Sequence, residues 1–355
     1  MRIIISYVPP MSQFRTLYRL LVLLTLIIAA PVRAADVTRA ELVMGTIARI
    51  TISDGTNDAA FEAAFAALRA VDESMSLYRS ESALVRVNAH AARHPEPVGS
   101  DLFACLERAL SLSAVTDGAF DVTVLPLLRA WGAYPGLDYL GSGRAEAVGW
   151  EGLILDPAAR AVRFLREGMG IDLGGIAKGF ALDRARAALV SGSVRRAVLD
   201  LGGNLALLGN GPSDGWRVAV RDPAAPEKTL GELTLGPNET VSTSGNYTRD
   251  FVTEGWLAPS HIYDPRTGRA VGVGLAATVW TPDAIAADAL STALIVLGPE
   301  GAAAVLARVP EVGALFVDDR GSERRIIFVG RAPRKFQPQT GRSHPTATAK
   351  HIERS

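Results

Sequence analysis

The chain has 355 residues, of which 48% are hydrophobic and 21% charged, and its formal net charge is zero. This composition is typical of a globular protein with a sizeable core and excludes a largely disordered chain. Residues 1–34 and 331–355 are basic, which leaves 27 basic and 36 acidic residues in the body. An acidic body excludes a nucleic-acid partner, which would require a basic face.

The first 34 residues are predicted to be a signal peptide. Arg15 and Arg19 form a basic region, an apolar run covers residues 20–30, and residues 32–34 end in a small residue before the expected cleavage site. The apolar run is short for a membrane span, and an uncleaved anchor is the alternative. No cysteine follows the run, so a lipid-anchored cysteine is excluded there. We therefore expect export to the periplasm.

The body predicts a mixture of helices and strands. In chain order we expect a strand at 46–53, helices at 58–76 and 101–114, a glycine-rich loop at 131–149, a helix at 176–191, a strand at 196–208 interrupted by Gly202-Gly203, a strand at 216–221, a helix at 282–297 capped by Thr281 and ended by Gly298, and strands at 312–317 and 325–329. Because helices and strands do not alternate regularly, a mixed α/β or α+β fold is favoured over a doubly wound sheet. Residues 35–330 then form one domain, and the polar, basic residues 331–355 are predicted to be a disordered tail.

The single cysteine, Cys105, lies in the apolar-periodic stretch of residues 102–112. One cysteine excludes an intramolecular disulfide and gives no support to a thiolate metal cluster. We expect Cys105 to be buried in the core.

The densest candidate motif covers residues 171–183. Asp172 precedes Gly174-Gly175, which open a predicted helix, and Lys178 follows in its first turn. Glycines allow a ligand to approach the backbone, a helix N-terminus attracts phosphate, and a lysine adds positive charge. A glycine turn without a ligand explains the segment equally well.

A second motif places Asp288 and Thr292 four residues apart on a predicted helix, so that they share one face. A carboxylate and a hydroxyl suit a hard cation whose coordination is completed by a carbonyl, water and phosphate oxygens. The alternative is a surface aspartate beside a threonine that bonds its own backbone.

His261 is the best candidate for a base near neutral pH, because it alone among five histidines is flanked by a predicted strand that ends in a tight turn at 264–268. A structural turn histidine is the alternative.

Residues 241–247 form an ordinary loop in this interpretation, although small hydroxyl residues beside a glycine can expose N–H groups to an anion. Phe120 could stack on the ring of a ligand, and Asp121 could accept a hydrogen bond from that ring. A phenylalanine buried in the core is the simpler explanation for Phe120.

Several common motifs are absent from the sequence. There is no dinucleotide-binding Gly-x-Gly-x-x-Gly, no GxxxxGK[ST] phosphate loop, no Gly-x-Ser-x-Gly elbow and no HExxH helix. The absence of these motifs argues against a common NAD-dependent, ATP-dependent or hydrolytic enzyme.

Taken together, the motifs of residues 41–329 resemble the ApbE-type FAD:protein FMN transferases. The resemblance rests on eight segments in matching order and spacing: Met44-Gly45-Thr46, residues 77–88, Gly118–Thr123, Asp172–Asp183, Leu199–Asn204, Ser242–Tyr247, His261–Gly268 and Asp288–Leu294. Each segment alone is weak evidence, whereas eight in order are specific.

The resemblance implies a two-lobed fold with FAD bound between the lobes. It places ten residues near FAD: Met44, Tyr78, Ala119, Phe120, Asp121, Asp172, Lys178, Ser244, Gly245 and Ile262. It makes Asp288, Thr292 and the main-chain oxygen of Ala177 ligands of Mg²⁺, and His261 the base. The implied reaction joins FMN to a threonine or serine of an acceptor protein by a phosphoester bond and releases AMP.

The family also implies an acceptor, a subunit of a membrane electron-transport complex with a Ser/Thr-Gly-Ala-Thr-like segment. Two other functions stay open at this point. One is a FAD pyrophosphatase that yields FMN and AMP, and the other is a non-catalytic periplasmic FAD-binding maturation protein. Tyr78, in place of a small polar residue, weakly favours transfer.

Overall fold

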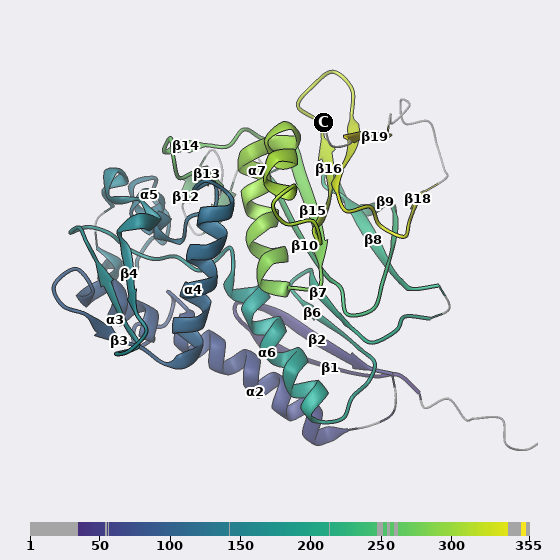
Figure 1. The fold of residues 1–355 in the computed structure, drawn as a ribbon, viewed down its shortest axis with the longest axis horizontal. Helices are drawn as coiled ribbons and strands as arrows, with labels where there is room; N and C mark the ends of the chain where they lie inside the picture. The colour runs from purple at the N-terminus through teal and green to yellow at the C-terminus, as the bar shows by residue number, and fades with distance from the viewer. Residues whose placement is uncertain are drawn as a thin grey trace, which may run out of the picture.

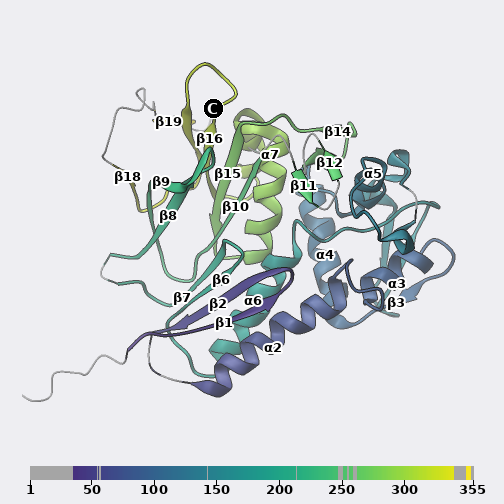
Figure 2. The ribbon, with the colours of Figure 1, turned by 180° about the vertical axis from the view of Figure 1, so that it is seen from behind.

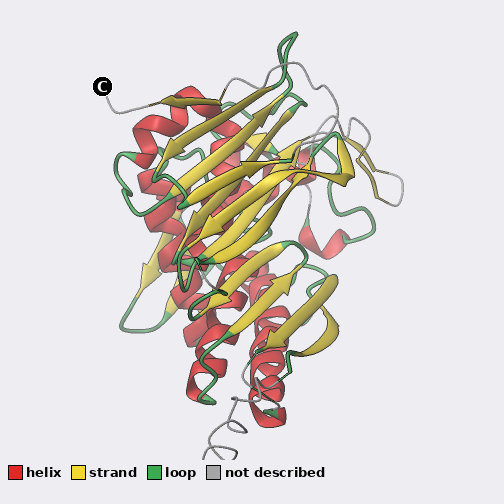
Figure 3. Ribbon diagram, turned by 90° about the vertical axis from the view of Figure 1, so that its right-hand side faces the viewer, coloured by secondary structure: helices red, strands yellow, loops and turns green. Residues whose placement is uncertain are grey.

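A nine-stranded sheet runs through the protein, with the strand order β1-β2-β6-β7-β10-β15-β16-β17-β19 (Figures 1 and 3). The computed structural model describes residues 35–339 and 349–352, except residues 54, 56, 142, 213, 247–250, 254–255 and 259–261. Neighbouring strands pair antiparallel, apart from the parallel pair β17 and β19. The strands are β1 (Val37–Val43), β2 (Thr46–Ile52), β6 (Ala197–Leu201), β7 (Asn204–Leu208), β10 (Thr240–Asn246), β15 (Leu275–Thr281), β16 (Gly313–Asp318), β17 (Arg325–Gly330) and β19 (Ala349–Ile352).

Helices cover one face of this sheet and bury its main apolar core (Figures 1 and 2). They are α2 (Asp58–Met75), α6 (Ala177–Ser191) and α7 (Ala284–Leu306), with α4 (Ser100–Val115) packed against α2 and α7. Cys105 of α4 is fully buried as expected, and burial raises the pKa of its thiol far above the ordinary value. The four helices confirm those predicted from the periodicity of the sequence.

Helix α7 differs from its prediction at both ends. Asp283, rather than Thr281, is the N-cap, and its side chain accepts a hydrogen bond from the backbone N–H of Ala286 at 3.0 Å. The helix is interrupted at Gly298, whose φ of 69° is left-handed, but a second segment continues from Pro299, which suits a first helical turn. By length and composition α7 is the one described helix that could cross a membrane, although most of it is buried in the core.

The opposite face of the large sheet carries a three-stranded sheet. It consists of β8 (Trp216–Asp222), β9 (Ala225–Leu235) and β18 (Lys335–Pro338). A second apolar cluster, with Trp280 at its centre, fills the space between the two sheets. The prediction of a disordered tail is therefore wrong for residues 335–338, whose backbone pairs with β9, and for residues 349–352, which pair with β17 as strand β19. The composition of the tail did not reveal this edge pairing.

A smaller lobe packs beside the helices and completes the expected two-lobed, mixed fold (Figure 1). It contains α3 (Ala83–His90), α5 (Leu125–Ala130), a small sheet of β3 (Glu96–Pro97), β5 (Ala161–Phe164) and β4 (Leu153–Asp156), and short 3₁₀ turns at Val122–Val124, Asp138–Leu140, Ala145–Ala147 and Trp150–Gly152. Two hairpins, β11 (Phe251–Thr253) with β12 (Trp256–Ala258) and β13 (Tyr263–Asp264) with β14 (Arg269–Ala270), complete the described elements. The predicted signal peptide lies outside the described residues.

Candidate active site

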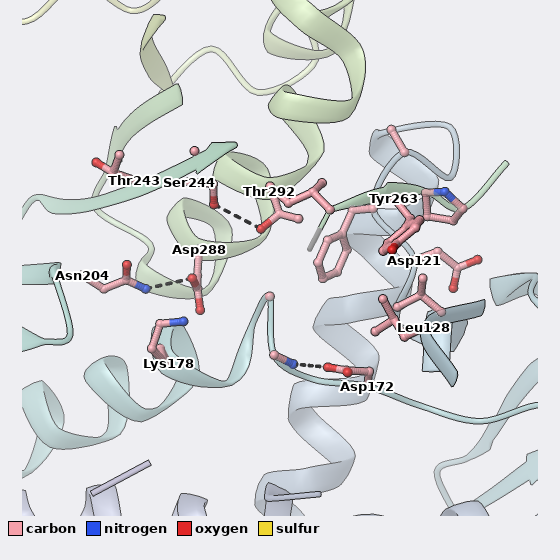
Figure 4. A pocket seen from close by; sticks show the side chains of 18 of the residues that line it. Asp121, Leu128, Asp172, Lys178, Asn204, Thr243, Ser244, Tyr263, Asp288 and Thr292 are labelled. Atoms are coloured by element: carbon pink, nitrogen blue, oxygen red, sulfur yellow. Dashed lines mark hydrogen bonds between the residues drawn. The ribbon is translucent and has the colours of Figure 1, made fainter. Parts of the chain in front are cut away.

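A cavity of about 500 Å³ is lined by residues from both lobes (Figure 4). Phe120 and Ile262 line it from the smaller lobe, whereas Lys178, Ser244 and Asp288 line it from α6, β10 and α7. A second compartment of about 520 Å³ adjoins it and shares four lining residues: Tyr134, Asp172, Gly174 and Lys178. The two compartments therefore form one groove, long enough in outline for an elongated ligand whose middle passes the start of α6.

The carboxylate of Asp288 is the centre of a buried hydrogen-bond network. One oxygen, Oδ2, accepts from the backbone N–H of Gly179 at 2.9 Å, and Oδ1 accepts from Asn204 Nδ2 at 2.8 Å. Ser242 Oγ lies 3.4 Å from Oδ1 and donates to Asn204 Oδ1 at 3.0 Å. These bonds fix the orientation of the carboxylate, as hydrogen-bonded neighbours do for metal ligands in general.

A chain of hydroxyl groups extends this network to Thr292. Ser291 Oγ lies 3.2 Å from Ser242 Oγ and 2.8 Å from Ser244 Oγ. Ser244 Oγ lies in turn 3.3 Å from Thr292 Oγ1. Thr292 is one turn beyond Asp288 on α7, so both side chains face the cavity, as the spacing predicts (Figure 4).

The donor set around Asp288 fits a hard divalent cation. The side chain is 3% exposed, yet its hydrogen-bond partners are neutral, and no arginine or lysine of the described chain forms an ion pair with it. A buried carboxylate without a counter-ion is costly unless a cation binds. Carboxylate and hydroxyl oxygens are the ligands that Mg²⁺ prefers. Ala177, the third expected ligand, is the first residue of α6 and lines the adjoining compartment.

At Gly179, α6 approaches α7 closely beside this carboxylate. A Cβ atom there would lie 2.2 Å from Ala284 O and 2.9 Å from Asp288 Cβ. Gly179→Ala is therefore expected to push the two helices apart and to lower the free energy of unfolding by about 1–3 kcal/mol, despite the better helix propensity of alanine. Chemical denaturation measures this change, with the exposed Val190→Ala on the same helix as control. Equal stability of Gly179→Ala and the parent would contradict the close packing.

Asp172 lies where the two compartments meet and is held by two donors. Its Oδ1 accepts from the backbone N–H of Gly174 at 2.6 Å, and its Oδ2 accepts from the hydroxyl of Tyr134. Burial raises the pKa of Asp172, while both hydrogen bonds lower it. The pKa of Tyr134 is raised well above its ordinary value, first by burial and then by the Asp172 charge. Tyr134 therefore stays a neutral donor near neutral pH.

Tyr134→Phe is expected to lower the free energy of unfolding by about 1–3 kcal/mol at neutral pH, because a buried carboxylate loses a donor. The loss of this hydrogen bond raises the folded-state pKa of Asp172 further above that of the unfolded chain. The loss of stability in the variant is therefore largest above the folded-state pKa of Asp172. It becomes smaller as the pH falls through this pKa, because the carboxyl group is then protonated. Urea unfolding at several pH values tests this. A stability difference that grows on acidification would contradict the assignment.

Phe120 and Asp121 both line the first compartment, but Asp121 has a local structural task as well. Its Oδ1 accepts from the N–H and hydroxyl of Thr123, both at 2.7 Å, and its Oδ2 accepts from the N–H of Trp150 at 2.9 Å. Burial raises the pKa of Asp121, against these bonds, which lower it. Both oxygens are thus already engaged in holding the loop that follows α4.

Met44 and Tyr78 border the second compartment. Met44 and Gly45 form the two-residue turn between β1 and β2, and Met44 adopts a φ of 53° there. A methionine at positive φ is uncommon and often accompanies a functional site. The Tyr78 side chain is 73% exposed, and its ring contacts the Tyr134 ring edge-on, with 5.6 Å between centroids.

The structure brings nearly all of the expected site residues to this groove. The first compartment contains Ala119, Phe120, Asp121, Asp172, Lys178, Ser244, Gly245, Ile262, Asp288 and Thr292, and the second contains Met44, Tyr78 and Ala177. The proposed base, His261, lies outside the described residues, although Ile262 directly after it lines the first compartment.

Four residues that hold the site were not singled out in the sequence: Tyr134, Asn204, Ser242 and Ser291. The last three lie on elements that flank Asp288, and each is at most 4% exposed. In the sequence, the only individual signal of these three residues was a polar side chain among apolar neighbours. Tyr134 gave none, because it lies within the glycine-rich loop. The interpretation of residues 241–247 as a loop is wrong for 241–246, which belong to β10, while Tyr247 lies outside the described residues.

Comparisons with known proteins agree on one family. A model described as the ApbE family matches residues 44–316. The chain is 32% identical over 309 residues to a FAD:protein FMN transferase of Treponema pallidum, covering 80% of this chain and 85% of that one. It is 31% identical over 287 residues to a FAD:protein FMN transferase of Klebsiella pneumoniae, covering 77% and 86%.

Solved structures give the same result. The crystal structure of the ApbE protein of Thermotoga maritima superimposes with a TM-score of 0.69 at 29% identity, covering 82% of this chain and 97% of that one. The flavin transferase ApbE of Vibrio cholerae gives a TM-score of 0.71 at 26% identity, covering 83% and 97%. The likeness therefore extends over both lobes.

Proposed function

The chain belongs to the ApbE family and is a FAD:protein FMN transferase, and from this premise we propose how its groove performs the transfer. FAD lies along the two compartments, with its pyrophosphate at the start of α6 beside Lys178. The acceptor is a threonine or serine hydroxyl of another protein. The single observation that carries this arrangement is the buried Asp288 carboxylate, without a counter-ion in the described chain, in the same cavity as Lys178.

The reaction breaks the bond between the two phosphates of FAD. The acceptor oxygen attacks the phosphorus of the FMN half, a phosphoester bond forms, and AMP leaves with the electrons of the broken P–O bond. His261 takes the proton of the hydroxyl, which is otherwise a weak nucleophile near neutral pH. Asp288, Thr292 and the Ala177 main-chain oxygen would hold Mg²⁺, which supplies positive charge next to the pyrophosphate.

Lys178 and the start of α6 act on the phosphates in the same way. The ammonium group contributes a point charge, and the first N–H groups of a helix attract anions. These groups stabilise the negative charge that develops on the leaving phosphate. Such electrostatic stabilisation makes the largest contribution to rate acceleration in most phosphoryl transfers. Tyr134 and Asp172 fix the loop at the junction, so that the ligand meets a preorganised surface.

Mass spectrometry of an acceptor peptide tests this function. The peptide carries a Ser/Thr-Gly-Ala-Thr-like segment and is incubated with the protein, FAD and Mg²⁺. We expect an FMN adduct on a threonine or serine, and no adduct after chelation of the metal. Free FMN without an adduct would instead indicate a pyrophosphatase, and bound FAD that stays intact would indicate a carrier.

We further propose that residues 1–34 export the protein to the periplasm, where it modifies a subunit of a membrane electron-transport complex. The basic and apolar segments of residues 15–30 support export. The mass of the protein recovered from the periplasm tests it. Loss of the first 34 residues is expected, and an intact N-terminus in the membrane fraction would show a retained anchor.

A further inference from the structure

Three side chains able to bind a metal ion cluster at one end of the smaller lobe, outside the active-site groove. His90 ends α3, Glu96 begins β3, and His94 lies in the turn between them. One ligand atom from each lies within 4.8 Å of the others. None of the three lines either compartment, and α4 lies between them and α7 in Figures 1 and 2.

The distance between His90 and Glu96 matches that between two ligands of one metal ion. His90 Nδ1 lies 3.3 Å from Glu96 Oε2. Two ligand atoms about 2.0–2.1 Å from a tetrahedral zinc ion would be separated by about 3.3 Å. The rings of His90 and His94 have centroids 5.6 Å apart and are tilted by 31°. His94 Nδ1 lies 3.3 Å from Pro95 O, which favours a proton there and leaves Nε2 to bind metal.

The backbone that carries these ligands is anchored at both ends. Ala91, directly after His90, accepts a hydrogen bond from the N–H of Phe164 at 2.9 Å. Glu96 pairs with Val162 in the small sheet. The Glu96 side chain is 12% exposed, and its other oxygen, Oε1, lies 3.6 Å from Arg86 Nε. One carboxylate oxygen is therefore oriented by Arg86 while the other faces the histidines.

We propose that His90, His94 and Glu96 form a binding site for Zn²⁺, with water in the remaining position. Two imidazoles and one carboxylate form a ligand set that zinc binds, whereas Mg²⁺ prefers oxygen ligands alone. The chain then has two metal sites of different chemistry, an oxygen site at Asp288 and this nitrogen-containing one. The proposed zinc site does not depend on the transfer reaction.

Zinc at this position would secure the C-terminal end of α3, which is hydrogen-bonded to the residue before Asp172. Asn88, two residues before His90, donates to Ile171 O at 2.9 Å and accepts from Ile171 N at 2.7 Å. Ile171 directly precedes Asp172. A metal that links α3 to β3 therefore stabilises the helix that holds this loop.

Calorimetric titration of the full chain with ZnCl₂, in excess Mg²⁺ and without a polyhistidine tag, tests the site. We expect one equivalent of zinc to bind, and the midpoint of thermal unfolding to rise with it. His90→Ala and His94→Ala should each weaken this binding by about 10-fold or more, since each removes a ligand. His344→Ala, which removes one histidine of the C-terminal segment, should leave it unchanged.

Glu96→Gln serves as a second variant, because an amide keeps the size of the side chain and an oxygen for Arg86 while removing the charge. It should bind zinc more weakly and unfold at the same temperature as the parent without metal. Unchanged zinc affinity in His90→Ala, His94→Ala and Glu96→Gln would overturn the proposal. Equal weakening of zinc binding by His344→Ala would overturn it as well, because binding would then not be specific to His90, His94 and Glu96.

Discussion

Replacing Asp288 with alanine is expected to lower magnesium-dependent FMN transfer by about 10³-fold, equivalent to about 4 kcal/mol of transition-state stabilisation. The carboxylate is the one charged ligand of the proposed cation. Without it, Thr292 and a main-chain oxygen remain, which are weak ligands. The activity of the variant should also respond little to added Mg²⁺, whereas the parent should show saturation.

Loss of stability is the competing explanation for this variant. Asp288 accepts hydrogen bonds from Gly179 and Asn204, so alanine leaves buried donors unpaired at a cost of about 1–3 kcal/mol. Asp288→Asn keeps the shape and most of the packing, and FAD binding to the folded variants separates the two effects. Glu107→Ala, which removes an exposed carboxylate of α4, is the control. Normal transfer by folded Asp288→Ala at sub-millimolar Mg²⁺ would contradict the metal assignment.

His261→Ala should lower the rate of transfer by about 10²–10⁴-fold, the usual contribution of a positioned base. The position of its neighbour supports this role, because Ile262 lines the cavity and its carbonyl accepts from the N–H of Val271 at 2.9 Å. The effect should fall on kcat, with FAD affinity nearly unchanged. Steady-state kinetics with acceptor peptide measure it, and His344→Ala is the control. Full activity of His261→Ala would remove this histidine from the mechanism.

The helical half of the fold could be predicted from the sequence because its signals are local. Apolar residues at helical spacing identified α2, α4 and α6. The single interrupted strand expected at 196–208 is instead the hairpin of β6 and β7, with Gly202 and Gly203 at its turn. Strand β10 escaped detection because its site-facing residues are serines, whose hydroxyls bond to α7 instead of packing as an apolar surface. Strand β18 is short and largely exposed apart from Phe336, and its pairing with β9 defines it.

The site was predictable to the extent that its residues occur in recognisable segments. Asp172, Lys178, Asp288 and Thr292 lie in motifs whose chemistry can be stated from residue type and spacing. Tyr134 could not be found in this way, because its contact with Asp172 joins residues 38 positions apart within irregular structure. Asn204 followed a glycine pair, but only its hydrogen bond to α7 in the folded protein shows that its amide orients Asp288.

The most direct test of transfer compares two acceptor peptides that differ only in their side-chain hydroxyl groups. One contains the threonine of a Thr-Gly-Ala-Thr-like segment and the other has valine at every position that carries a hydroxyl. AMP release from FAD is measured with each, together with the FMN adduct. We predict equal amounts of AMP and adduct with the threonine peptide, and neither with the valine peptide. AMP released at the same rate with valine, without an adduct, would contradict the account, because water would then be the acceptor.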